Sequence, residues 1–77
     1  MSQIIWSEYL KYRANLRKFD LDKIEDILRF TSERYYDTET DRLIAVGKHH
    51  GILVIIPYEI NQEFILEVTH LYQKSRV

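Results

Sequence analysis

The sequence predicts an α+β domain in which two N-terminal helices pack on a small antiparallel β-sheet of three to four strands. Apolar residues recur at helical spacing in the first part of the chain, and the spacing changes to alternation from Arg34 onward. No linker rich in Pro or Gly interrupts the 77 residues. A chain of this length is expected to fold as one domain over residues 1–77.

The first helix is expected to begin after Ser7, whose hydroxyl suits an N-cap. Apolar residues follow at helical spacing and are expected to form the face that packs on the sheet. The residues of this face are Ile5, Tyr9, Leu10, Tyr12, Ala14 and Leu16. Lys11 and Lys18 lie on another face, which gives the helix a basic side.

A second helix is expected to begin at the N-cap Asp20, so the link between the helices lies near Lys18–Asp20. Phe19 and Ile24 occupy the two positions of a hydrophobic staple around this cap. Acidic residues in the first turns match the positive end of the helix dipole. Its apolar stripe consists of Ile24, Ile27, Leu28 and Thr31.

The strands are predicted from alternation and β-branched runs. They are residues 34–36, 42–48, 52–56 and 63–71. Gly51 is expected to take a positive φ in the hairpin loop after residue 48. Pro57 is expected to end the ladder of the third strand. In the last strand, alternation places Phe64, Leu66, Val68 and His70 on one face.

Composition excludes several classes of protein. The chain has no Cys, so it has neither disulfides nor thiolate zinc sites. The longest apolar run, Ile52–Ile56, is too short to cross a bilayer, and no signal peptide is visible, so we expect a cytoplasmic protein. The net charge of −1 argues against strong non-specific binding to nucleic acid. Residues 8–19 nevertheless carry a net charge of +3, and a local basic groove built from this segment, Arg42, Lys48 and the tail remains open.

A few side chains have chemistry that suits a site. His70 ends the last predicted strand and is a candidate acid or base, with a structural role at the strand end as the alternative. Arg42 and Lys48 bracket the second strand as candidate phosphate ligands or as solvated charges. His49 and His50 are neighbours whose rings point apart in a strand, so we expect no metal site. Four tyrosines offer surfaces for base stacking or for packing: Tyr35, Tyr36, Tyr58 and Tyr72.

Three short motifs carry a resemblance that spans nearly the whole chain. They are Val46-Gly47-Lys48-His49, the apolar strand Ile52–Tyr58, and Val68-Thr69-His70. With the two preceding helices, they resemble the RelE/ParE superfamily of toxins from type II toxin–antitoxin pairs, and in particular its BrnT-like members.

The resemblance implies a ribonuclease that cuts mRNA, requires no metal or other cofactor, and is neutralised by a cognate antitoxin protein. It implies His70, Lys48 and Arg42 as catalytic residues, and Tyr58, Lys74 and Arg76 as substrate-binding residues. The chain departs from the pattern because it is nearly neutral and ends at Val77, without the basic C-terminal helix that many members have.

Two other functions stay open. One is a non-catalytic protein-interaction module with a toxin-like fold, which predicts a large exposed apolar or aromatic patch. The other is a gyrase-type inhibitor, because the superfamily that the chain resembles also contains gyrase inhibitors and members with no demonstrated activity. A homodimer is a further expectation, through the strand end at Pro57 or through the first helix.

Overall fold

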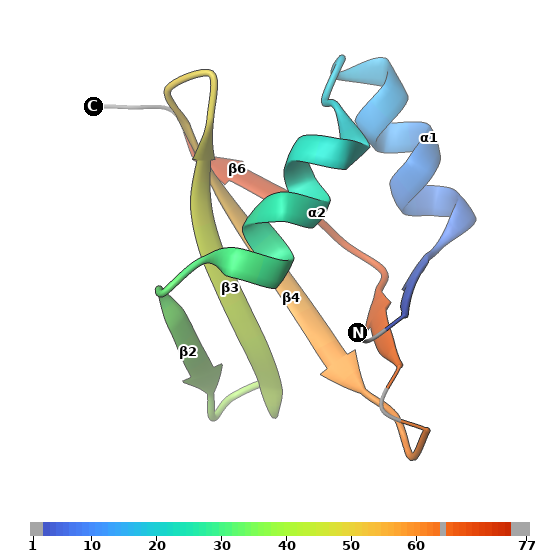
Figure 1. Cartoon of the computed structure of the whole chain (residues 1–77), viewed down its shortest axis with the longest axis vertical. Coiled ribbons are helices and arrows are strands. Elements are labelled where there is room, and N and C mark those ends of the chain that lie inside the picture. Colours follow the sequence, from blue (N-terminus) through green and yellow to red (C-terminus); the bar gives the residue numbers. More distant parts are fainter. Residues whose placement is uncertain (1–2, 64, 75–77) are drawn as a thin grey trace.

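A computed structural model describes residues 3–63 and 65–74 (Figure 1). It is a small mixed α+β domain with two helices and a six-stranded sheet. The elements, in chain order, are β1 (Ile4–Trp6), α1 (Glu8–Leu16), α2 (Leu21–Phe30), β2 (Arg34–Asp37), β3 (Arg42–His49), β4 (Ile52–Ile60), β5 (Leu66–Val68) and β6 (Tyr72–Lys74).

The predicted sheet of three to four antiparallel strands is wrong. The sheet has six strands in the order β1-β5-β4-β3-β2, and β6 also pairs with β4. It is mixed, because β1 runs parallel to β5 while the other pairs are antiparallel. Strands make up 42% of the described residues, which is more than the two helices contribute.

The helices are also not the first elements of the chain, because β1 precedes α1. Ile5, expected on the helix, lies in this strand and pairs with Glu67. Three residues are too few to show alternation, and their partners are about 60 residues away in the sequence. Nothing local distinguishes such a strand from the start of a helix.

The single strand predicted over residues 63–71 is instead two short strands along β4. β5 pairs with Glu59 and Ile60, and β6 pairs with residues 53–55. Pro57 lies between these two stretches and does not end β4, which continues to Ile60 in register with β3. Proline is tolerated there because neither β5 nor β6 has a register partner opposite it. Phe64 lies outside the described residues.

The predicted hairpin between the two long strands is confirmed. β3 and β4 pair from Leu43 with Tyr58 to His49 with Ile52. The two loop residues, His50 and Gly51, have φ angles of 53° and 77°. Positive φ at both positions is the geometry of a two-residue hairpin turn whose twist matches that of the strands.

Both predicted helix caps are confirmed. The Ser7 hydroxyl accepts from the Leu10 N–H at 3.0 Å, and an Asp20 carboxylate oxygen accepts from the Asp22 N–H at 2.9 Å. α1 ends in a Schellman-type turn, in which Lys18 has a φ of 59° and the Phe19 N–H donates to the Ala14 carbonyl at 2.9 Å. This turn directs the chain back for α2.

The core lies between the two helices and one face of the sheet. Ile24 and Leu28 of α2 are fully buried, as predicted, and so are Leu10 and Ala14 of α1. The rest of the stripe predicted for α1 is wrong, because its other members on the helix are half or more exposed. These residues are Tyr9, Tyr12 and Leu16. Only the Leu10–Ala14 side of α1 is buried, while the side that carries Tyr9 faces the chain that joins β5 to β6 and stays exposed.

The opposite face of the sheet is covered by no described helix (Figure 1). Side chains alternate between the faces of a strand, so the register assigns residues to it. We call this surface the bare face; its residues are Ile5, Tyr35, Asp37, Arg42, Ile44, Val46, Lys48, Leu53, Ile55, Pro57, Glu59, Glu67, Tyr72 and Lys74. No helix of the described chain is long and apolar enough to cross a membrane.

Candidate functional site

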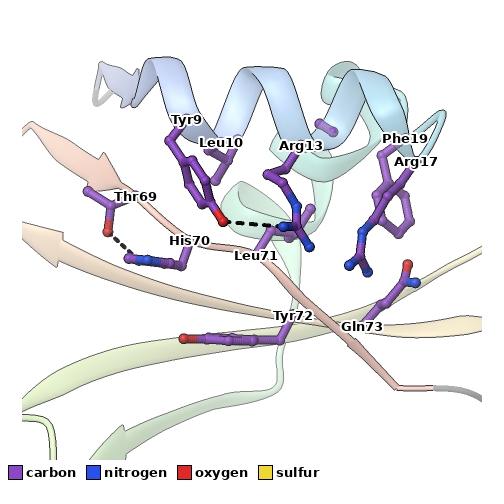
Figure 2. A pocket seen from close by; sticks show the side chains of 11 residues that line it. Tyr9, Leu10, Arg13, Arg17, Phe19, Thr69, His70, Leu71, Tyr72 and Gln73 are labelled. Atoms are coloured by element: carbon purple, nitrogen blue, oxygen red, sulfur yellow. Dashed lines mark hydrogen bonds between the residues drawn. The ribbon is translucent and has the colours of Figure 1, made fainter.

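A pocket of about 200 Å³ lies between α1 and the chain that joins β5 to β6 (Figure 2). We call it the α1 pocket. Its lining residues are Tyr9, Leu10, Arg13, Ala14, Arg17, Phe19, Thr69, His70, Leu71, Tyr72 and Gln73. Two basic side chains, an imidazole and two phenols therefore meet around one hollow, and they come from the two ends of the sequence.

The helical side of the α1 pocket follows from spacing along α1. Tyr9, Arg13 and Arg17 are four residues apart, so they lie on one face of the helix. Figure 2 shows all three side chains directed toward residues 69–73. Arg13 donates from Nη1 to the Tyr9 hydroxyl at 3.3 Å, and its Cζ lies 5.8 Å from the centre of that ring. Arg17 makes no polar contact with the described residues that line the pocket, so its guanidinium is available to a ligand.

The other side of the α1 pocket is formed where the last strand breaks. Leu71 is half-buried against the core, while its neighbour His70 is exposed. The His70 ring lies 6.3 Å from the Tyr72 ring and nearly parallel to it, and 5.9 Å from the tilted Tyr9 ring. His70 Nδ1 lies 3.0 Å from Thr69 Oγ1. Two rings and a hydroxyl thus fix the imidazole at the mouth of the pocket.

Two hydrogen bonds tie the helix to this strand break. The Ser7 N–H donates to the Val68 carbonyl at 3.0 Å, and the Ser7 hydroxyl donates to the Thr69 carbonyl at 3.2 Å. Because Ser7 is also the N-cap, one residue starts α1 and anchors it next to His70. The two walls of the α1 pocket are therefore held in a fixed relation.

The α1 pocket is electrostatically suited to an anion. None of the described residues that line it is Asp or Glu, whereas Arg13 and Arg17 are both cationic. The nearest acidic residue on α1, Glu8, is paired with Lys11 at 2.8 Å. Arginine offers a planar set of donors that matches phosphate and carboxylate oxygens. The flanking tyrosines add apolar faces on which a planar base can stack.

Of the three residues expected to be catalytic, the α1 pocket contains His70 alone. Arg42 lies on the bare face and pairs with Glu59, with 3.5 Å between Nε and Oε1. Lys48 lies on the same face at the other end of β3. Six residues of a strand separate these two cations by about 20 Å. The structure therefore does not bring His70, Lys48 and Arg42 together.

The residues expected to bind substrate are also dispersed. Tyr58 is buried, and its hydroxyl accepts a hydrogen bond from Arg34 Nη1 at 3.1 Å in a separate cavity next to α2. Lys74 is exposed on the bare face, in register with Leu53. Arg76 lies outside the described residues.

Sequence reasoning placed Arg13 and Arg17 in a basic segment but did not select them. A signal for them exists, since Tyr9, Arg13 and Arg17 repeat every four residues within the segment of net charge +3. That pattern identifies a shared face without identifying what lies opposite it. The strand break at residues 69–71 completes the α1 pocket, and no local sequence pattern predicts it.

The other two histidines, His49 and His50, lie at the β3–β4 hairpin and do not line the α1 pocket. His49 is 95% buried, and its Nε2 has no hydrogen-bond partner among the described residues. Burial lowers the pKa of His49, and the neighbouring His50 lowers it further. Within residues 3–63 and 65–74, no three His, Asp or Glu side chains gather closely enough to hold a metal ion.

Comparison of the chain with protein-family models, with curated protein sequences and with solved structures finds no match. The α1 pocket is therefore interpreted from its own geometry and chemistry.

Proposed function

We propose that this domain is a ribonuclease that requires no metal, and that it cuts RNA in the α1 pocket with His70 as its acid–base group. The observation that carries the proposal is the meeting of His70 with Arg13 and Arg17 in one pocket whose described lining has no carboxylate. A phosphodiester needs cationic donors, and its cleavage needs a group that moves protons near neutral pH.

The reaction consistent with these groups is attack by the ribose 2′-hydroxyl on its own phosphate. With its Nδ1–H donated to Thr69, His70 takes the 2′-hydroxyl proton at Nε2. The 2′-oxygen then bonds to phosphorus, the bond from phosphorus to the 5′-oxygen breaks, and a 2′,3′-cyclic phosphate is formed.

The other pocket residues complete this reaction. Arg13 and Arg17 stabilise the charge that builds on the phosphate oxygens. The Tyr9 hydroxyl already accepts a hydrogen bond from Arg13, so its own proton is free to pass to the departing 5′-oxygen. The Tyr72 ring provides a stacking surface for the adjacent base.

The biological setting that fits this activity is the toxin of a type II toxin–antitoxin pair. In that setting the protein arrests growth by cleaving mRNA, and a cognate antitoxin protein binds and neutralises it. The support for this setting is the resemblance of the sequence motifs to the RelE/ParE superfamily, and the pocket chemistry is compatible with it.

The direct test is cleavage of an end-labelled RNA by the purified chain in excess EDTA. We expect fragments ending in a 2′,3′-cyclic phosphate, a loss of about 100-fold or more in rate for His70→Ala, and a similar loss for the pair Arg13→Ala and Arg17→Ala. His50→Ala is the matched control, because it removes an exposed imidazole from the hairpin loop instead. Cleavage should remain with His50→Ala.

Two results would overturn the proposal. One is absence of cleavage together with normal growth of a bacterial host that expresses the chain alone. The other is loss of cleavage in Arg42→Ala or Lys48→Ala with full activity in the Arg13 and Arg17 variants. The second result would move the reaction to the bare face.

The bare face favours a second candidate function, a non-catalytic interaction module. It has the exposed apolar and aromatic character that this function predicts, with Tyr35 and Tyr72 more than half exposed. The His70→Ala variant separates the two functions, since a module that acts by binding through the bare face keeps its effect in that variant.

A further inference from the structure

The bare face carries its charges in rows that run across the strands. At one end, Lys48 is in register with Leu53 of β4, and Leu53 is in register with Lys74 of β6. Two ammonium groups therefore flank one leucine across three neighbouring strands. Lys48 and Lys74 are both exposed. We call this set the basic row.

The other end of the bare face is acidic. Asp37 is in register with Arg42, Arg42 pairs with Glu59, and Glu59 is in register with Glu67. Three carboxylates and one guanidinium thus form a second row across four strands, which we call the acidic row. About 20 Å separates the two rows along β3, from Lys48 to Arg42.

Between the two rows the bare face is apolar. Two middle rows cross the sheet there, and their paired strand residues are uncharged; Glu33, beside Val46 at the β2 edge, accepts a hydrogen bond from the Tyr35 hydroxyl at 3.3 Å. Their members are Val46, Ile55 and Tyr72 in one row, and Tyr35, Ile44 and Pro57 in the other. Tyr35 and Tyr72 are 56% and 53% exposed, so the rims of this strip are open to solvent.

We propose that this face binds a second copy of the chain, and that the two bare faces form a symmetric homodimer. A two-fold axis across the strands, between the two middle rows, places each basic row on the acidic row of the other copy. Lys74 then lies over the region of Glu67, and Lys48 lies over Arg42, which has Asp37 and Glu59 on its two sides. The same rotation places the apolar middle of one copy on that of the other. Two sheets packed in this way form a sandwich with a shared apolar layer.

The second copy is the occupant because the pattern is complementary to itself. An isologous interface must match its own surface after a two-fold rotation. A face of a single charge would repel its copy, whereas this one has opposite charges at opposite ends and an apolar centre. The α1 pocket shares Tyr72 with the bare face, but the basic and acidic rows lie outside the pocket, so charge reversal in these rows tests the dimer separately from the ribonuclease.

Charge reversal tests the dimer and its axis. The wild-type chain should sediment at twice its 9.4 kDa mass at low ionic strength, and added salt should weaken this association. A variant with Lys48→Glu and Lys74→Glu should dissociate, and so should one with Glu59→Lys and Glu67→Lys. We expect the dissociation constant to rise at least about tenfold in each. Mixed together, the two variants should form a heterodimer, because opposite charges meet again at both ends.

The matched control carries Lys11→Glu and Lys23→Glu, which make the same charge change on the helices. This control should remain dimeric, and circular dichroism should show that every variant is folded. A wild-type chain that stays monomeric at all concentrations would overturn the proposal. It would also be overturned by variants that still self-associate, or by variants whose mixture fails to associate.

Discussion

The two faces of this sheet are built from the same strands but differ in how deeply most of their apolar side chains are buried, with Val46 of the bare face, 9% exposed, as an exception. On the face under the helices, Ala45, Val54 and Ile56 are completely buried. On the bare face, their chain neighbours Ile44, Leu53 and Ile55 are equally apolar but only half-buried. Hydrophobicity along a strand therefore does not tell which side is covered. The position of two helices decides it.

The comparison predicts its largest effect for neighbouring residues of β4. Ile56→Ala should lower the free energy of unfolding by about 3 kcal/mol, because it leaves a cavity in a fully packed core. Ile55→Ala should lower it by about 1 kcal/mol or less, since the half-buried site can relax toward solvent. Urea unfolding of both variants at dilute concentration gives the two values. Equal losses would mean that the bare face is as tightly packed as the core.

A smaller effect is expected where α2 lies closest to the sheet. A Cβ at Gly47 would lie 2.6 Å from Cγ2 of Ile27, so Gly47→Ala must push α2 away from β3. We expect a loss of about 2 kcal/mol in the free energy of unfolding.

Gly51→Ala is the control for Gly47→Ala. A Cβ at Gly51 meets nothing within 4 Å, and the loss there, about 1 kcal/mol, reflects its φ of 77° alone. Thermal unfolding compares the two. A smaller loss at Gly47 than at Gly51 would contradict the close approach of α2 to β3.

The smallest effect concerns His49, which lies on the covered face and is buried without a partner for Nε2. Its pKa is lowered by burial, then by His50, against an opposing effect of Asp20, with Lys23 lowering it slightly. The unfolded chain therefore binds a proton more readily than the folded one. The stability contributed by neutral His49 is complete above the ordinary pKa of histidine, near 6.5, and is lost as the pH falls toward the folded pKa.

Urea unfolding at several pH values measures this dependence, and His49→Leu should flatten it. His70→Leu is the control at an exposed imidazole and should leave most of the dependence in place. An unchanged slope in His49→Leu would assign the dependence to other groups.

Much of the local structure was predictable because its causes are local. Ser7 and Asp20 cap their helices through hydrogen bonds to residues two or three positions later. Ile24 and Leu28 lie on one side of α2 by helical spacing alone, and Gly51 turns the hairpin. None of these features depends on a distant part of the chain.

The candidate site was predictable only in part. His70 was selected from its residue type and its position at a strand end, and it does line the α1 pocket. Arg42 and Lys48 were selected because they bracket a strand, but the pleat directs both to the bare face. Which face is covered depends on where the helices pack. The strand sequence does not indicate this when the residues on both faces are apolar.

The sequence by itself determined the helix caps, the α2 stripe, the β3–β4 hairpin and the basic character of residues 8–19. These follow from the chemistry of neighbouring residues. Only the tertiary structure decided that β1 pairs in parallel with β5, that Tyr9, Tyr12 and Leu16 stay exposed, and that Arg13 and Arg17 meet His70. Those outcomes depend on contacts between segments about 60 residues apart. Such contacts form where the whole chain buries the most apolar surface, and the local conformational preference of a single segment does not determine them.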